Sequence, residues 1–212
     1  MRRSGFAALA GALLLLVACG GNAVAASHAS GCTKISKPPK LGAHNMAKPK
    51  LTLSAKKTYD VTMQTNCGSF TIQLDQKQSP KTAASFVYLV QKGFFDKTIF
   101  HRIVPGFVIQ GGDPTGTGTG GPGYLTVDTP PKSAKYTHGV VAMAKTQTQP
   151  AGTSGSQFFI VTVPDAGLTP DYAIIGKVVK GLDVVDHIGQ LGNAQQQPTQ
   201  IVEILKATVS AK

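Results

Sequence analysis

The sequence contains no tryptophan, only one glutamate and only three cysteines among 212 residues. The single glutamate, Glu203, and the scattered aspartates leave no obvious place for a pair of catalytic carboxylates, which glycoside hydrolysis requires. The five histidines lack the spacing of a metal site, so no metal is expected. These absences argue against several common classes of hydrolytic enzyme.

Acidic residues are scarce compared with basic ones, and the formal net charge is +11. Of the 21 basic residues only three are arginine, so 18 are lysine, and the lysines form no run and do not alternate with aromatic residues. Nucleic-acid binding is therefore not expected. A dispersed charge of this kind is typical of a solvated basic surface that is weakly attracted to anionic lipid.

The scarcity of arginine draws attention to Arg102. Arg2 and Arg3 lie in a segment that we expect to be removed, so the mature chain would keep Arg102 alone. A guanidinium is a rigid, planar fork of donors that stays charged, and a lysine cannot replace it. Either Arg102 ties a strand to a loop, or the chain needs this fork for its chemistry.

The N-terminus has the features of an export signal. Arg2 and Arg3 precede an apolar run of about 12 residues, 6–17, which is too short to span a bilayer as a helix. The run ends in LVAC (16–19), which resembles the bacterial lipobox. We therefore expect residues 1–18 to be a lipoprotein signal peptide and Cys19 to carry a lipid anchor on the outer face of the cell membrane. The alternative is cleavage after the AVA sequence at 23–25, which would give a secreted protein.

Residues 19–57 are rich in Ala, Ser, Lys, Gly and Pro and have no apolar periodicity, so a flexible tether is predicted before a domain at 58–212. If Cys19 is lipidated, Cys32 and Cys67 remain as a pair. In an oxidising compartment they can form a disulfide, and the alternative is two free thiols. Their spacing fits no zinc or redox motif.

Strand patterns dominate from residue 58 onward. Alternation of apolar and polar residues predicts strands at 59–65 and 69–74 with a turn between them, and Ser79, Pro80 and Gly93 mark the two ends of a helix. The pattern predicts a mainly β fold, a closed eight-stranded antiparallel barrel capped by two helices. The remaining expected strands are 99–101, 107–111, 139–144, 157–161, 174–179 and 201–209, and the second helix is 182–188.

Two partial motifs point to chemistry that the context does not support. Gly116, Gly118 and Gly121 have the spacing of a dinucleotide fingerprint, but no helix is expected after them to bind a pyrophosphate. We interpret this run as a tight surface loop. The sequence GTSGS (152–156) resembles a nucleophile elbow but ends in serine instead of glycine, so a serine hydrolase is not expected.

An apolar site with one fixed cation remains. Such a set has little capacity for acid–base or nucleophilic chemistry and suits a reaction that breaks no covalent bond. Its candidate members are the apolar Phe107, Phe159 and Leu168, the amides of Gln110 and Gln157, and Arg102 at the edge.

At these residues the chain resembles the cyclophilin-type peptidyl-prolyl cis–trans isomerases. The resemblance is carried by FHRIVPGFVIQGGDPTGTGTGGPGY (100–124), GSQFFI (155–160) and IIGKV (174–178), and it extends over about residues 58–209. It implies an eight-stranded barrel capped by two helices. It also implies an isomerase of X-Pro bonds that needs no cofactor. Together with the lipobox, it leads us to expect a monomer that acts on proline-containing segments of exported proteins. The alternative is a non-catalytic peptide-binding chaperone module that uses the same groove.

The resemblance also implies roles for individual residues. Arg102, Phe107 and Gln110 correspond to the catalytic set, and Phe107, Val108, Phe159 and Leu168 to the proline pocket. Gln110 would hold the substrate backbone, and Ala144 and Lys145 would offer backbone groups to the residue before proline. His101, Gln157 and Tyr172 would line the same region.

Three positions depart from the family's usual pattern. Tyr172 stands where many members have histidine, and Lys145 replaces the usual asparagine within a longer segment, 143–156. Lys145 and the longer segment leave the preference for the residue before proline open. Gly167 stands where many eukaryotic members have a tryptophan that supports cyclosporin binding, so weak cyclosporin binding is expected.

Overall fold

The structure, a computed structural model, describes residue 1, residues 31–37, residue 39 and residues 41–212. Cys19 and both expected cleavage sites lie outside the described residues. Along the described chain the elements are β1 (Tyr59–Thr65), β2 (Gly68–Leu74), α1 (Pro80–Gln91), β3 (Thr98–Ile99), β4 (Arg102–Val104), β5 (Val108–Gly111), β6 (Thr126–Val127), β7 (Val140–Met143), β8 (Thr153–Ser154), β9 (Phe158–Val161), β10 (Ile174–Lys180), α2 (Leu182–Gly189) and β11 (Glu203–Ala211). No helix among the described residues combines the length and apolar character that crossing a membrane would require.

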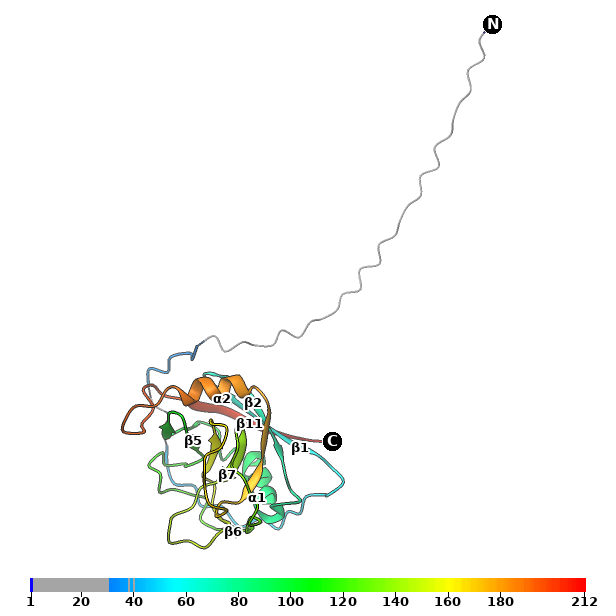
Figure 1. Ribbon diagram of the computed structural model, residues 1–212, viewed down its shortest axis with the longest axis vertical. Coiled ribbons are helices and arrows are strands. Elements are labelled where there is room, and N and C mark those ends of the chain that lie inside the picture. The colour runs from blue at the N-terminus through cyan, green and yellow to red at the C-terminus, as the bar shows by residue number, and fades with distance from the viewer. Residues whose placement is uncertain (2–30, 38, 40) are drawn as a thin grey trace.

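One curled antiparallel sheet contains nine of these strands (Figure 1). Its order is β3-β11-β1-β2-β10-β7-β9-β5-β4, and β6 pairs with β8 in a separate small sheet. The prediction of a mainly antiparallel β fold with two helices is confirmed. The prediction of a closed barrel of eight strands is wrong, because the two edge strands, β3 and β4, form no ladder with each other. These two strands are only two and three residues long and follow one another in the chain. Near the gap between them, Ile99 forms an isolated bridge to Asp113.

The β1–β2 hairpin forms as the alternating sequence predicts. Val61 and Met63 of β1 and Phe70 and Ile72 of β2 are completely buried, while the residues between them are partly or fully exposed. The turn is one residue shorter than expected, because Gly68 already pairs with Thr65. This hairpin supplies one wall of the main core.

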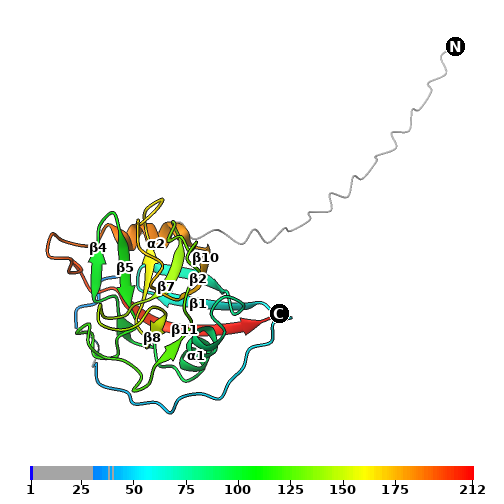
Figure 2. The same ribbon diagram turned by 60° about the horizontal axis from the view of Figure 1, so that its bottom comes forward.

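Helix α1 begins and ends close to the predicted residues. Pro80 is its first residue, and Gly93, with a positive φ of 66°, follows its end. Ser79 is the N-cap residue, as predicted, but its hydroxyl makes no capping hydrogen bond and donates instead to the carbonyl of Ile174 at 2.7 Å. Helices α1 and α2 lie at opposite ends of the curled sheet in both views (Figures 1 and 2).

Strands β4, β5, β7 and β9 separate two apolar clusters. Because side chains alternate between the two faces of a strand, residues such as Ile109 and Ile160 point into the main core, while their neighbours Val108 and Phe159 belong to a second cluster. The second cluster therefore lies on the outer face of this part of the sheet. It also contains Tyr136, which is completely buried.

The predicted flexible tether requires a correction within residues 31–57. Cys32 forms a disulfide with Cys67, so the structure has this pair bonded instead of free. Beyond it, residues 41–57, which we call the strap, lie along the domain, and Met46 and Leu53 pack against the main core. In Figure 2 this blue segment runs around the lower side of the domain before it enters β1. The large apolar side chains of the strap, Leu41, Met46, Leu51 and Leu53, follow no helical or strand period, so the sequence pattern did not reveal the packing.

Candidate active site

A row of paired residues crosses four neighbouring strands and forms the floor of the site. Arg102 on β4 pairs with Gln110 on β5, Gln110 pairs with Phe159 on β9, and Phe159 pairs with Ala142 on β7. Residues that are directly opposite in a ladder project from the same face of the sheet. The register therefore brings the predicted cation, the predicted amide and the predicted aromatic ring together on the outer face.

A chain of hydrogen bonds links Arg102 to the glycine-rich loop, Pro114–Gly123. Arg102 Nη1 donates to Gln110 Oε1 at 3.2 Å, and Gln110 Nε2 donates to Gln157 Oε1 at 3.0 Å. Gln157 Nε2 in turn donates to the carbonyls of Gly118 and Gly120, both at 2.9 Å. Both glutamines lie at the predicted site. In each, the side-chain N–H group donates a hydrogen bond and the side-chain oxygen accepts one.

Gln196 holds the other side of the guanidinium, and sequence reasoning missed it. Arg102 Nε donates to Gln196 Oε1 at 2.8 Å, and the N–H of Ile103 donates to the Gln196 carbonyl at 3.0 Å. Gln196 lies in the loop between α2 and β11 and has a positive φ of 64°. It is one of three consecutive glutamines, a run that carries no spacing signal.

The second apolar cluster contains the residues predicted for a proline pocket. Phe159 and Val108 are buried at its base, and the other predicted members are partly exposed. The Tyr172 ring meets the Phe159 ring edge to face, with 5.4 Å between the ring centroids. The predicted members that the structure brings together here are Phe107, Val108, Ala144, Phe159, Leu168 and Tyr172.

Tyr136, which the sequence did not single out, fixes the position of Tyr172. Its hydroxyl donates to the Tyr172 carbonyl at 2.8 Å and accepts from the Tyr172 N–H at 3.0 Å. Burial raises the pKa of Tyr136 above its ordinary value of 10, so the hydroxyl stays protonated. A tyrosine between a lysine and a threonine gave no sequence signal for this role.

His101 is a neutral neighbour of the cation. Burial lowers its pKa below the ordinary value of 6.5, the Asp113 carboxylate opposes this shift, and the charge of Arg102 adds to it. Both ring nitrogens are buried and have no hydrogen-bond partner among the described residues. Its Cδ2 would lie 3.8 Å from a Cβ placed at Gly118, so the ring stands against the glycine-rich loop.

Asp113 organises the glycine-rich loop from the inside. Its fully buried carboxylate accepts from the N–H groups of Thr115 (2.7 Å), Gly118 (2.6 Å) and Gly120 (3.0 Å). Burial alone would raise the pKa of Asp113, but the hydrogen bond from the Thr115 hydroxyl (2.7 Å) and those from the three N–H groups outweigh it and lower the pKa below its ordinary 3.8. The loop amides bind a carboxylate of the same chain and β6 follows instead of a helix, so the interpretation as a tight loop is confirmed.

A cavity of about 420 Å³ adjoins the amides of Gln110 and Gln157. One side is the glycine-rich loop and the other is the segment after β7, where Lys145 Nζ donates to the Gln149 carbonyl at 3.1 Å. The Ala144 N–H donates to the Gln157 carbonyl at 2.9 Å, so the backbone group that Ala144 can offer to a ligand is its carbonyl. The cavity is lined by Gln110, 118–125, 144–146, Gln149 and 155–157.

The serines of the partial nucleophile elbow are buried and engaged. The Ser156 hydroxyl donates to the Gly112 carbonyl at 2.7 Å, and the Ser154 hydroxyl donates to the Gly152 carbonyl at 3.1 Å. Neither faces a base, so this segment has a structural role. Within the described part of the chain, no three metal-binding side chains gather at one place.

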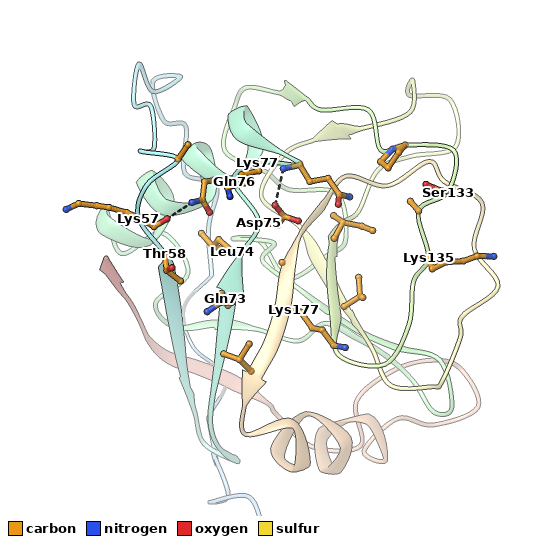
Figure 3. Close-up of a pocket in the computed structure, with 18 of the residues that line it drawn as sticks. Lys57, Thr58, Gln73, Leu74, Asp75, Gln76, Lys77, Ser133, Lys135 and Lys177 are labelled. Carbon is orange, nitrogen blue, oxygen red and sulfur yellow. Dashed lines mark hydrogen bonds between the residues drawn. The ribbon is translucent and has the colours of Figure 1, made fainter. Parts of the chain in front are cut away.

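A larger cavity, of about 830 Å³, lies elsewhere, beside β2 and β10 (Figure 3). Its floor includes a hydrogen bond from Gln76 Nε2 to the Lys57 carbonyl at 2.6 Å. Lys57, Lys77, Lys135 and Lys177 stand around it, as expected for a solvated basic face. None of the residues predicted for the site lines this cavity.

Comparison with known proteins agrees with this arrangement. Residues 60–209 match the family "Cyclophilin type peptidyl-prolyl cis-trans isomerase/CLD". The chain is 38% identical over 155 residues to peptidyl-prolyl cis-trans isomerase CYP18-2 of Arabidopsis thaliana, which covers 71% of this chain and 93% of the relative. It is 39% identical over 153 residues to peptidyl-prolyl cis-trans isomerase-like 1 of Mus musculus, covering 70% and 90% respectively.

Solved structures give the same result. A cyclophilin type peptidyl-prolyl cis-trans isomerase of Cryptosporidium parvum has a TM-score of 0.66 and 32% identity, covering 72% of this chain and 98% of that one. A crystal structure of the same protein in the presence of the dipeptide Ala-Pro has a TM-score of 0.65 and 33% identity, covering 71% and 98%. The chain therefore belongs to the cyclophilin-type peptidyl-prolyl cis–trans isomerases, and it is an enzyme that interconverts the cis and trans forms of X-Pro peptide bonds.

Proposed function

We propose that Arg102 is the catalytic cation of this isomerase, with Phe107 and Gln110 completing the catalytic set. Rotation about a peptide bond must overcome a resonance barrier of about 18–20 kcal/mol. In the twisted bond this resonance is lost, and the proline nitrogen gains a lone pair that can accept a hydrogen bond. A guanidinium donor aimed at that nitrogen stabilises the twisted state more than the planar one, which lowers the barrier.

The second apolar cluster, on the outer face of the sheet, would bind the proline ring. Phe107, Val108, Phe159 and Leu168 offer aromatic and aliphatic surface next to the Arg102–Gln110 pair. Seating the ring there removes water from the neighbourhood of Arg102, and this strengthens the hydrogen bond to the twisted nitrogen. No covalent bond forms or breaks, and each step uses only side chains of this chain.

The polar groups of the site would hold the substrate backbone. Gln110 and Gln157 present amides at the edge of the 420 Å³ cavity, and Ala144 and Lys145 lie on its opposite side. This cavity suits the residue that precedes proline. Lys145 would influence the choice of that residue, because its ammonium stands 5.5 Å from the Tyr172 ring centroid at the boundary of the two pockets. His101, neutral at pH 7, adds a wall and not a proton-transfer group.

The observation that supports these roles most directly is the guanidinium held from two sides, by Gln110 and Gln196. A merely binding groove has less need of such a fixed cation, so nothing favours the alternative of a non-catalytic chaperone module. The test is isomerisation of an X-Pro bond in a model peptide, comparing the wild type with Arg102→Ala. If the wild type and the variant accelerate the reaction equally, the role of Arg102 is refuted.

We also propose that the enzyme acts on proline-containing segments of exported proteins, as a monomer anchored by a lipid at Cys19. The signal-like residues 1–18 support export, and so does the Cys32–Cys67 disulfide, since disulfides persist mainly in oxidising compartments. Mass spectrometry of the mature N-terminus tests this directly. A diacylglyceryl-modified Cys19 is expected, whereas an unmodified N-terminus after the alanines at 23–25 would indicate a secreted protein. Light scattering tests the monomer.

Weak inhibition by cyclosporin is a further expectation. Gly167 is exposed and has a positive φ of 62°, and a Cβ placed there would meet nothing within 4 Å. This position therefore offers no aromatic surface to a bulky apolar ligand. A titration of isomerase activity with cyclosporin checks the point, and submicromolar inhibition would refute it.

A further inference from the structure

We propose that residues 41–46 of the strap position the active site, acting through the glycine-rich loop Pro114–Gly123. They touch no substrate group, so they are positioning residues and not catalytic ones. The inference rests on the proposed role of Arg102, because it concerns how the hydrogen-bonded chain that ends at Arg102 is kept in place. It extends the functional part of the molecule to residues outside the matched family region, 60–209.

Four contacts join the strap to the loop. The Gly42 N–H donates to the Pro114 carbonyl at 3.0 Å, and the Met46 N–H donates to the Pro122 carbonyl at 2.8 Å. The third contact is at Gly116, which lies between Pro114 and Pro122 on the loop: Leu41 Cδ1 would lie 2.5 Å from a Cβ placed there. The fourth contact is at Gly123, where the side-chain oxygen of Asn45 would lie 2.9 Å from an added Cβ. The strap thus holds the loop near both of its ends and at Gly116.

The same loop ends the hydrogen-bonded chain of the active site. Gln157 donates to the carbonyls of Gly118 and Gly120, which lie between the points that the strap holds. Gln157 in turn accepts from Gln110, and Gln110 accepts from Arg102. A displacement of the loop therefore moves the acceptors of Gln157 first and the guanidinium last.

The chain is held in place on both sides of the strap. Upstream, Cys32 is bonded to Cys67, and Asn66 beside it donates through Nδ2 to the Thr33 carbonyl at 2.9 Å. Downstream, the chain enters β1, whose ladder with β11 runs over its full length. No strap residue from 41 to 46 lines the cavity beside Gln110, so the strap contacts the loop away from the substrate side.

The central experiment replaces Leu41 in the full chain. Leu41→Ala removes the side chain that packs on Gly116, and we expect kcat/KM for a model X-Pro peptide to fall by about tenfold, because small displacements of catalytic groups are costly. Leu41→Met keeps the apolar contact and should retain most of the activity. Leu51→Ala is the matched control, because Leu51 is an exposed strap leucine and no contact to the loop involves it.

A second pair of variants tests the backbone contact. Gly42→Pro removes the N–H that donates to the Pro114 carbonyl, whereas Gly42→Ala keeps it, and a Cβ at this position meets nothing within 4 Å. We expect the proline variant to lose activity and the alanine variant to keep it. This pair keeps the proposal testable if Leu41→Ala folds poorly.

Amide NMR signals distinguish positioning from plain stability. In Leu41→Ala the signals of Gly118 and Gly120 should shift, while the melting temperature stays close to that of Leu51→Ala. Wild-type kcat/KM in a folded Leu41→Ala, or an equal loss in Leu51→Ala, would overturn the proposal. A loss that follows only the unfolded fraction, with the loop signals unchanged, would also overturn it. An inactive wild type would instead refute the roles proposed for the isomerase site, so the two failures are distinguishable.

Discussion

Arg102 and Gln196 are 94 residues apart in the sequence, yet Arg102 Nε donates to Gln196 Oε1 at 2.8 Å. Together with the Nη1 bond to Gln110, this contact uses two of the five N–H donors of the guanidinium. The other three donors make no hydrogen bond to the described residues and are available for a substrate. The plane of the fork is therefore set before a peptide binds, and such preorganisation is what electrostatic stabilisation of a twisted bond requires.

The first prediction concerns Arg102 itself. Arg102→Ala removes the only donor set that the proposal aims at the proline nitrogen, so kcat/KM should fall about 100- to 1,000-fold, as for the loss of an oxyanion-hole donor. Protease-coupled or NMR exchange measurements on a model X-Pro peptide check this. Arg102→Lys keeps a charge but loses the fork, and it should recover only part of the activity. Full activity in the lysine variant would show that charge alone is sufficient.

The second prediction concerns Gln196. Glycine accepts the positive φ at this position without strain, so Gln196→Gly removes the amide while it leaves the loop backbone relaxed. Loss of one exposed hydrogen bond, which contributes about 0.5–1.5 kcal/mol, should lower kcat/KM about three- to tenfold. Gln195→Gly is the matched control, because Gln195 is an exposed neighbour whose side chain makes no hydrogen bond to Arg102. Equal activity in the two variants would argue against a positioning role for Gln196.

Much of the fold was predictable because its long elements have strong local patterns. The alternation in β1 and β2, and Pro80 and Gly93 around α1, each determine their element locally. The strands that the sequence missed, β4, β6 and β8, are two or three residues long and exist only through their partners. The strand predicted at 99–101 ends two residues beyond β3, because apolar Phe100 follows Ile99 although the ladder already stops there.

The active site divides in the same way. The motif assigned Arg102, Gln110 and Phe159 to one site, and the ladder register of the structure brings them into one row. Gln196 and Tyr136 each act through two hydrogen bonds to a segment far away in the chain, and neither position has a local signature. The strap was interpreted as a tether for the same reason. It is held partly by backbone N–H groups, which every residue except proline has, so these contacts leave no pattern in the sequence.

The third prediction concerns the disulfide. Cys32 and Cys67 are 35 residues apart, and cross-linking a loop of this length stabilises a fold by about 3–4 kcal/mol through the unfolded state. Urea denaturation with and without a reducing agent should show a loss of this order. A Cys32→Ser/Cys67→Ser double variant should match the reduced wild type and should not respond to the reducing agent. A wild type whose midpoint ignores reduction would show that this pair contributes no stability.

The fourth prediction concerns pH and follows from His101. Because burial lowers its pKa below 6.5 in the folded protein, the unfolded chain binds a proton first as the pH falls. The contribution of His101 to stability is therefore present above about pH 6.5 and decreases as the pH falls towards 5, by at most about 1.4 kcal/mol per pH unit for one proton. His101→Phe removes the titrating ring, so its free energy of unfolding should decrease less between pH 7.5 and 5 than that of the wild type. Urea titrations at several pH values measure both, and the window stays above the ordinary pKa of Asp113, 3.8. Parallel curves for wild type and variant would show that His101 titrates equally in the folded and unfolded states.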